Sequence, residues 1–220
     1  MIFIIAEAGV NHGGSVEIAE RLIDHAKAAG ANAVKFQLFK DRPEIERLRM
    51  TENQIFDLSD FAKRAGIEFA CTPFYVEAVA FLDPLVKRHK IASGWMKNPE
   101  IFDAALATGK PVIASMGMAE IGVHAYRNKP NASFLHCISL YPCPDEKANL
   151  SKINTWWITG YSDHTVGTLA CVAAAAMGAK IIEKHLTLDK TTAGPDHSCS
   201  AEPAEFAAMV RDIRRVETML

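Results

Sequence analysis

The sequence predicts an α/β fold, a (β/α)8 barrel of the TIM type, from three observations. Short β-rich runs alternate with amphipathic helical stretches along the 220 residues, which favours a parallel sheet. The β-rich runs number eight, and no phosphate-binding GxGxxG follows the first of them, which favours a closed barrel over a doubly wound sheet. Because 220 residues over eight units leave about 27 residues per unit, whereas such barrels usually need ~250, we expect a compact barrel with shortened βα loops.

Each strand candidate is a short apolar run bounded by turn signals. In order, the strands are expected at Phe3–Ala8, Ala33–Phe39, Glu68–Thr72, His89–Ser93, Pro111–Ser115, Ser133–Ile138, Thr159–Ser162 and Lys180–His185. Helical spacing of apolar residues predicts the elements between them. The helices are expected at Ser15–Ala29, Glu52–Ala65, Glu77–Val86, Pro99–Ala107, Asn149–Trp157, Val166–Met177 and Pro203–Met219.

Start and stop signals support several of these helices. Ser15 and Thr51 stand where an N-cap side chain is expected. Glycines fall just past four helix ends, where a left-handed residue is wanted, at Gly30, Gly66, Gly109 and Gly178. The unit between Met118 and Ser133 is thin and has room only for a short helix, which Pro130 limits.

Composition narrows the classes of protein to which the chain can belong. A hydrophobic content of 49% over 220 residues supports one domain, 1–220, with a full core. The net charge of −2 and the lack of a basic stripe argue against nucleic-acid binding. No apolar run has the ~18–20 residues needed to span a bilayer. The five cysteines form no CxxC pair, which suits reduced thiols and a cytoplasmic location.

Two histidines at neighbouring strand ends give the strongest functional signal. His164 stands in GYSDHT and His185 in IIEKHLTLDK. The chemistry of such barrels lies on the loops after the strands, so both imidazoles are expected at the mouth. With Asp163, Glu183 and the GPDH segment nearby, they suit a divalent metal. The alternative is one satisfied core histidine and one solvent histidine.

Two lysines inside apolar strand sequences predict an anion pocket at the same mouth. Lys35 lies in AVKFQLF and Lys90 in HKIAS, where an inward charge is costly without a partner. Hydroxyl residues stand at other strand ends, namely Thr72, Ser93, Ser115 and Ser162. Together these groups suit a phosphate or carboxylate ligand. A single lysine can instead snorkel to the surface, and the loop Asn11–Gly14 is either a flexible turn or part of the site.

Ten ordered blocks resemble the catalytic domain of N-acetylneuraminate (sialic acid) synthases and of related enzymes that make other nonulosonic acids. The blocks are IIAEAGVNHGG, AGANAVKFQLFK, GIEFACTPF, KIASG, GKPVIASMGMA, LHCISLYPCP, NLSKI, GYSDHTVG, GAKIIEKHLTLDK and GPDHSCSAEPAEFAAMVRDIR. They run through nearly the whole chain. The resemblance implies a (β/α)8 barrel, in agreement with the independent count of strands.

The resemblance also implies a reaction and roles for individual residues. Members of the family condense phosphoenolpyruvate with the open-chain aldehyde of an N-acyl hexosamine such as N-acetylmannosamine. They use a divalent metal, typically Mn²⁺, with Mg²⁺ or Co²⁺ as alternatives, and His164 and His185 match its ligands. Matching the phosphoenolpyruvate site are Lys35, Thr72, Lys90, Ser93, Ser115, Ser139, Tyr141 and Ser162. Facing the sugar or the reacting centre, as catalytic candidates, are Glu7, Gln37, Tyr141 and Asp196.

Several departures from the family pattern fall on the sugar side. Trp95 stands where the family usually has a glutamate that contacts the sugar, and Ser139 stands where asparagine is common. The loop from Lys40 to Met50 is shorter than usual, and the C-terminal antifreeze-like domain, which supplies an arginine to the partner's site, is not in this sequence. We therefore expect phosphoenolpyruvate and metal binding to carry over better than turnover of N-acetylmannosamine. The oligomeric state is open, with a homodimer as one alternative.

Three functions remain in competition. The first is the phosphoenolpyruvate-dependent aldol-type synthase. The second is a related synthase or lyase that acts on a different, smaller aldehyde, which Trp95 and the short loops favour. The third is an inactive barrel that binds a ligand, and the buried charges expected at Lys35 and Lys90 argue against it because idle buried charges cost stability.

Overall fold

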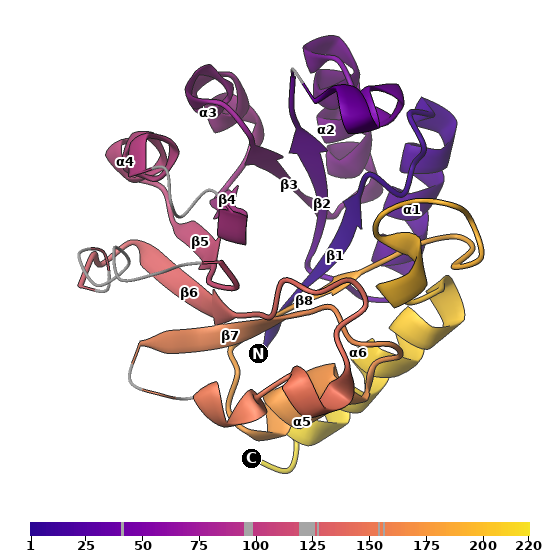
Figure 1. Cartoon of the computed structure of the whole chain (residues 1–220), viewed down its shortest axis with the longest axis vertical. Coiled ribbons are helices and arrows are strands. Elements are labelled where there is room, and N and C mark those ends of the chain that lie inside the picture. The colour runs from indigo at the N-terminus through magenta and orange to yellow at the C-terminus, as the bar shows by residue number, and fades with distance from the viewer. Residues whose placement is uncertain (41, 95–98, 119–125, 127, 154, 156) are drawn as a thin grey trace.

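A computed structural model of the chain shows eight parallel strands that form a nearly closed barrel, as predicted (Figure 1). It describes residues 1–40, 42–94, 99–118, 126, 128–153, 155 and 157–220. The strands are β1 (Phe3–Gly9), β2 (Ala33–Leu38), β3 (Glu68–Pro73), β4 (His89–Ile91), β5 (Val112–Ser115), β6 (Ala132–His136), β7 (Ile158–Asp163) and β8 (Ile181–His185). Their hydrogen-bonded order is β3-β2-β1-β8-β7-β6-β5-β4, so the first and last strands pair in the middle of the order.

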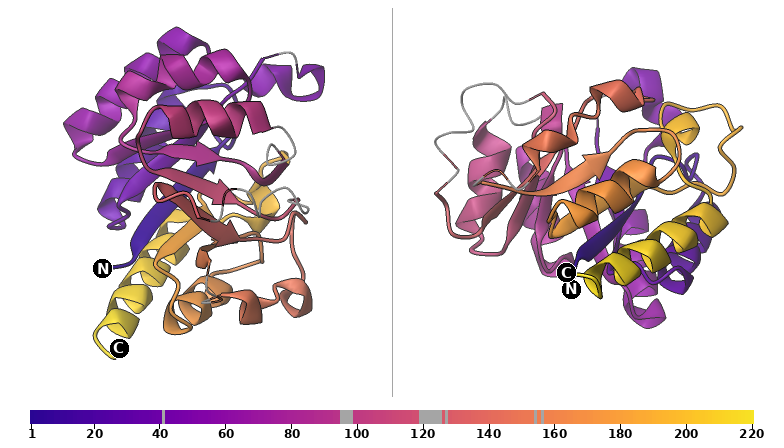
Figure 2. Two further views of the ribbon diagram at one scale, coloured as in Figure 1. Left: turned by 90° about the vertical axis from the view of Figure 1, so that its left-hand side faces the viewer. Right: turned by 90° about the horizontal axis from the view of Figure 1, so that it is seen from below.

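Helices surround the strands and cover the outside of the barrel (Figures 1 and 2). They are α1 (Val16–Ala28), α2 (Glu52–Ala65), α3 (Val76–Leu82), α4 (Pro99–Ala107), α5 (Leu169–Ala176) and α6 (Pro203–Glu217). The predicted caps are confirmed. The Ser15 hydroxyl accepts from the backbone of Ile18, and Thr51 forms a capping box with Gln54. The four expected glycines all have positive φ, from 74° to 99°.

The helix predicted at Asn149–Trp157 is wrong. The segment contains a short 3-10 helix, Leu150–Lys152, between a left-handed Asn149 (φ 48°) and an extended Ile153 (ψ 146°). Asn tolerates the left-handed region and favours turns, and the extended backbone of Ile153 ends the 3-10 helix after one turn. Another 3-10 helix, Asp145–Lys147, precedes it. The thin unit expected between Met118 and Ser133 lies mostly outside the described residues.

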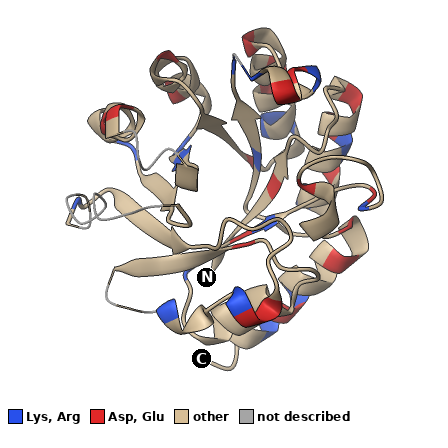
Figure 3. Ribbon diagram, viewed as in Figure 1, with Lys and Arg blue, Asp and Glu red and all other residues tan. Residues whose placement is uncertain are grey.

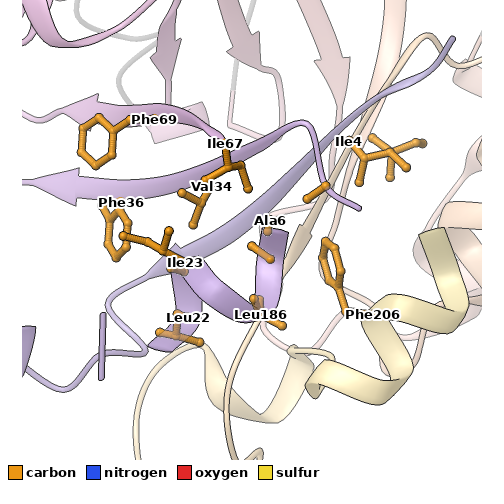
Figure 4. Packing of buried hydrophobic residues seen from close by; sticks show 14 of the residues in the cluster. Ile4, Ala6, Leu22, Ile23, Val34, Phe36, Ile67, Phe69, Leu186 and Phe206 are labelled. Atoms are coloured by element: carbon orange, nitrogen blue, oxygen red, sulfur yellow. The ribbon is translucent and has the colours of Figure 1, made fainter. Parts of the chain in front are cut away.

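Two apolar layers lie on opposite sides of the strands. The larger one fills the space between the barrel and its helices, with Ile4, Val34, Leu22 and Phe206 among its members (Figure 4). The smaller one plugs the inside of the barrel near the start of the strands. It consists of Ile5, Ala33, Ile113 and Leu135, with Phe3 and Ile181 packed against them. Side chains two positions further along several of these strands therefore point into the barrel at its other end.

The two ends of the chain lie close together (Figure 2). The backbone nitrogen of Ile2 donates to Glu217, and Arg214 donates to the carbonyl of Ile2 at 2.8 Å. Most charged residues lie on the outer helices, but some lie on the central strands (Figure 3). None of the helices in the described part of the chain is long and apolar enough to cross a membrane.

Candidate functional site

A cavity of about 90 Å³ opens inside the barrel at the carboxyl ends of the strands. It gathers twelve of the thirteen predicted site residues: Glu7, Lys35, Gln37, Thr72, Lys90, Ser93, Ser115, Tyr141, Ser162, His164, His185 and Asp196. The thirteenth, Ser139, lines an adjoining outer hollow, and its Oγ lies 2.9 Å from the Oγ of Ser93. The roles assigned to these residues stay predictions, but the structure brings their side chains together.

Strand register explains why residues distant in the sequence meet here. Glu7 on β1 is the partner of Lys35 on β2 and of His185 on β8. Ser162 on β7 is the partner of Glu183 on β8. Since side chains alternate across a strand, partners in register point to the same side of the sheet. Ile5, Ala33 and Ile181, which point into the barrel as part of its apolar plug, stand two positions before Glu7, Lys35 and Glu183. The charged side chains therefore point into the barrel as well.

Four buried charged side chains form a layer in the cavity. The Nζ of Lys35 lies 2.7 Å from Oε2 of Glu7 and 3.8 Å from Oε2 of Glu183. The Nζ of Lys90 lies 3.3 Å from Oε1 of Glu183. Each of the four residues is at most 4% exposed. Two carboxylates and two ammonium groups offset one another, which reduces the cost of burying them.

Burial and mutual attraction shift the pKa values of this layer in different directions. Burial raises the pKa of Glu7 to about 7, although Lys35 opposes the shift. Burial raises the pKa of Glu183 less than Lys35 and Lys90 together lower it, so the net shift is downward. Burial also disfavours the charged form of Lys35, but the nearby Glu183 and Glu7 outweigh it and hold the pKa of Lys35 above its usual value. For Lys90, burial dominates and lowers the pKa. The layer thus combines an ionised carboxylate with one that exchanges a proton near neutral pH.

Hydroxyl groups complete the surroundings of both lysines. Lys90 donates to Oγ of Ser115 at 2.8 Å, and Lys35 donates to Oγ1 of Thr72 at 3.2 Å. Ser162 donates to Oε1 of Glu183 at 2.9 Å. Ammonium groups beside hydroxyls provide several donors for an oxyanion, the arrangement expected of a phosphate or carboxylate site.

The two imidazoles lie side by side above the charged layer. Their ring centroids are 5.4 Å apart, and the ring of Tyr141 lies 4.0 Å from that of His164. Burial lowers the pKa of His164, and burial together with the neighbouring His164 holds the pKa of His185 well below its usual range. Both rings are therefore neutral at physiological pH, so each keeps one nitrogen lone pair.

These neutral rings fit the chemistry of a metal ligand. Nδ1 of His164 lies 2.7 Å from the carbonyl of Ile138, to which it must donate, so the lone pair is on Nε2. Nδ1 of His185 is buried, 3.7 Å from Oδ2 of Asp196, and has no hydrogen-bond partner among the residues that the structure describes. Across the described ranges, no three His, Cys, Asp or Glu side chains converge on one point suited to an ion. An ion bound by the two histidines would take its other ligands from water or substrate.

The loop that carries Asp196 is tied to the β1–α1 loop. The amide of Asn11 donates to the carbonyl of Leu186 and to Oγ of Ser200, both at 2.9 Å, and Ser200 in turn donates to the carbonyl of Asp196. Asn11 therefore braces the site from behind. His12 does not line the cavity; its Nδ1 accepts from Gly14, and burial lowers its pKa to about 4. Burial raises the pKa of Asp196 to about 6.

Three further outcomes concern the predicted site. The expectation that Asp163 lies beside the imidazoles is wrong, because its carboxylate points out of the barrel and binds Lys184 at 2.7 Å. Glu183 contacts both lysines, although the sequence indicates it only as a neighbour of the histidines. Its position two residues before His185 on the same strand, which puts both side chains on one side of the sheet, is the signal that predicts an inward orientation. Trp95 lies outside the described residues.

The outer hollow extends the cavity toward solvent. It shares Gln37, Phe74 and Asp196 with the inner cavity and continues over the β2–α2 connection. That connection contains a 3-10 helix, Pro43–Leu48. Lys40 lies over the ring of Tyr75, with its Nζ 4.2 Å from the ring centroid, and both residues line this hollow. An inner cavity lined by two lysines and a wider outer hollow together have room for two ligands of different size.

Comparison with known proteins agrees with this architecture. An uncharacterized protein from Methanocaldococcus jannaschii is 42% identical, over 99% of this chain and 72% of that protein. An N,N'-diacetyllegionaminic acid synthase from Legionella pneumophila is 37% identical, over 99% of this chain and 73% of that protein. A crystal structure of N-acetylneuraminic acid (sialic acid) synthetase from Leptospira borgpetersenii, in complex with citrate, superposes with a TM-score of 0.92 at 37% identity. It covers 99% of this chain and 84% of that one.

A family model matches as well, and the lengths of the aligned regions differ. The Legionella alignment spans 259 residues against the 220 of this chain, so that relative carries additional residues within the matched region, in line with shortened loops here. The model of the NeuB family matches residues 42–220. The chain therefore belongs to the NeuB family, whose members similar to it include sialic acid and legionaminic acid synthases.

Proposed function

We propose that this protein joins phosphoenolpyruvate to the open-chain aldehyde of an aldose, an N-acyl hexosamine such as N-acetylmannosamine, and releases phosphate. The product is a nonulosonic acid, and the enzyme is a transferase that forms a C–C bond. The observation that carries the proposal is the pair of buried lysines, Lys35 and Lys90, in one cavity with two neutral imidazoles. Membership of a family of synthases supports the same reaction class.

The lysines and hydroxyls serve the phosphoenolpyruvate. Lys35 and Lys90 neutralise its phosphate and carboxylate. Thr72 and Ser115 accept hydrogen bonds from these lysines and use their own hydroxyl hydrogens to donate to the same oxygens. Because these donors are fixed before substrate binds, little reorganisation is needed when charge develops. Glu183, which contacts both lysines, keeps the two ammonium groups charged and in place.

The bond changes balance with one water molecule. C3 of phosphoenolpyruvate forms a bond to the aldehyde carbon, whose oxygen takes up a proton. Water adds to the electron-poor C2 and loses one proton. The C2–O bond to phosphate then breaks as C2 forms a ketone, and the second proton of the water leaves with the phosphate. Glu7 and Asp196, with pKa values raised to about 7 and about 6 by burial, are the groups proposed to exchange these protons.

His164 and His185 are proposed to hold a divalent metal ion, with Mn²⁺ favoured over Mg²⁺ or Co²⁺. When bound, the ion supplies a Lewis acid that polarises the aldehyde oxygen. Two features of the chain support this: the pair of neutral imidazoles, and the buried Nδ1 of His185, which lacks a hydrogen-bond partner within the described part of the chain. Tyr141 packs against both rings and restricts their rotation.

Phosphate release from phosphoenolpyruvate tests the proposal across a panel of aldoses that includes N-acetylmannosamine, its phosphorylated form and shorter aldehydes. We expect release that depends on an aldose and on a divalent ion, with weak turnover of N-acetylmannosamine. Release with only the shorter aldehydes would support the alternative of a smaller acceptor. No release with any aldose, from protein that binds phosphoenolpyruvate, would contradict the proposed reaction.

A further inference from the structure

Behind the two imidazoles, on the outer side of the same strands, lies a buried ion pair. Asp163, the last residue of β7, and Lys184 on β8 are partners in register. Both side chains are 0% exposed. Asp163 lies within reach of Tyr161 and of Cys171 on α5, so the pair occupies the layer between the barrel and its helices.

Several contacts of this pair fix the backbone next to a histidine. Lys184 donates to Oδ2 of Asp163 at 2.7 Å and to the carbonyl of Thr165 at 2.6 Å. Oδ1 of Asp163 accepts from the backbone nitrogen of Thr165 at 3.0 Å and from the hydroxyl of Tyr161 at 2.9 Å. The residue after His164 is thus held through both its N–H and its C=O, and the residue before His185 is the lysine itself.

Packing alone gives no reason for charges at this position. Other outward-facing residues of the strands, such as Ala6, Val34 and Ile182, are apolar and buried in the same layer. Removing two charges from water is expensive, and an apolar pair of similar volume is often as stable or more stable. What an apolar pair lacks is direction, because only hydrogen bonds fix the backbone of Thr165 relative to β8.

We propose that Asp163 and Lys184 are positioning residues that set the separation and orientation of His164 and His185. The inference rests on the proposed function in one respect, namely that His164 and His185 take part in the site. The backbone carbonyl of His164 also accepts from Cys143 at 2.8 Å, so the histidine is anchored from the loop side and from the ion pair. The pair touches neither Lys35 nor Lys90 in the described contacts, so it should act on the imidazoles alone.

The test replaces both charges together by Asp163→Asn and Lys184→Met, which keeps side-chain volume and leaves no unpaired charge. The matched control is Glu68→Gln with Arg88→Met. That pair is 10% and 28% exposed, has its closest contact at 2.5 Å, and lies at the start of β3, away from the mouth. We would measure kcat and KM per folded molecule and the affinity for Mn²⁺ alone. Nitrogen NMR spectra of labelled imidazoles, assigned with single His→Ala variants, would report on the two rings directly.

We expect the double variant to lose about 10- to 100-fold in kcat or in Mn²⁺ affinity, the range typical of groups that orient metal ligands. KM for phosphoenolpyruvate should stay within about threefold, because its lysines are untouched. The His164 and His185 signals should shift, whereas the control variant should retain the parent spectrum and kcat. Unchanged imidazole signals with unchanged kcat would overturn the inference and leave a purely structural pair.

Two further measurements keep the inference testable. If the double variant does not fold, Tyr161→Phe removes one hydrogen bond to Asp163 and keeps the ring; we expect it to shift the His164 signal, and an unchanged spectrum and kcat would overturn the inference. If the parent releases no phosphate with any aldose, the proposed function fails, and the spectra alone then decide whether the pair orients the imidazoles.

Discussion

The same strands line two layers of the barrel interior, an apolar lower half near the start of the strands and a charged upper half at their carboxyl ends. In the lower half, Ile5 and Ala33 belong to an apolar plug. Two positions later on the same strands, in the upper half, stand Glu7 and Lys35, which form an ion pair at 2.7 Å. One period of the β-strand therefore separates a packing layer from a charged layer.

The two layers differ in what they contribute to the folded state. Burying the apolar plug stabilises the fold by about 25 cal/mol per Å² of apolar surface removed from water. Burying four charges costs desolvation energy that their mutual attraction offsets only in part. The charged layer therefore contributes less to stability than the apolar plug, and we propose that it is present because a ligand needs both lysines.

The plug should determine stability and leave the site intact. Leu135→Ala removes a fully buried side chain of the plug, which should lower the free energy of unfolding by about 2–5 kcal/mol. Affinity of the folded protein for phosphoenolpyruvate should be nearly unchanged. Denaturant unfolding and calorimetry measure the two quantities, and a large loss of affinity would show that the layers are not separable.

The charged layer should oppose stability at high pH. Burial raises the pKa of Glu7 from 4.5 to about 7, so the folded state binds the extra proton between these values. Its contribution is present at low pH and is lost as pH rises through about 7, by at most about 3 kcal/mol. Unfolding curves of the parent and of Glu7→Gln should therefore diverge from pH 5 to pH 8, with the variant gaining relative to the parent. The buried histidines change stability with pH in the opposite direction, but they are common to both proteins and cancel in the difference. A difference in the free energy of unfolding that stays constant with pH would contradict the raised pKa of Glu7.

The lysines should matter for ligand binding more than for folding. Lys35→Met and Lys90→Met should each weaken phosphoenolpyruvate binding by about 1.5–3 kcal/mol, the value of a charge-assisted hydrogen bond. The increase in Tm produced by phosphoenolpyruvate reports this through linkage. Lys63→Met, on the exposed face of α2, is the matched control. If both cavity variants are protected as strongly as the parent, the lysines are structural.

The imidazoles should bind metal without contributing to the plug. The double variant His164→Ala, His185→Ala should lose at least about tenfold in Mn²⁺ affinity, since both ring ligands are gone. Single substitutions of His136, which is bonded to the carbonyl of Ala148 outside the cavity, serve as the control. Calorimetric titration with Mn²⁺ measures the effect, and equal affinities for parent and double variant would exclude the site.

Sequence patterns were sufficient for the strands because alternation and turn signals are local. All eight strands lie where predicted, with ends that differ by a few residues. The prediction of a helix at Asn149–Trp157 is wrong because a left-handed Asn149 and an extended Ile153 limit the segment to one 3-10 turn, which apolar spacing does not reveal. In the site, the expectation that Asp163 lies beside the imidazoles is wrong because residues adjacent in a strand point to opposite sides of the sheet, so nearness to His164 in the sequence does not bring the two side chains together. The brace from Asn11 to Ser200 joins residues 189 positions apart, which no local pattern contains.

The most direct test of the central claim is a calorimetric titration of phosphoenolpyruvate into the parent protein and into Lys35→Met, Lys90→Met combined, in the presence of Mn²⁺. We predict saturable binding of one phosphoenolpyruvate per chain to the parent and a loss of at least about 100-fold in affinity for the double variant, from two charge-assisted contacts. Equal affinity for both proteins, or no binding to a folded parent, would show that the charged layer of the barrel mouth is not the phosphoenolpyruvate site.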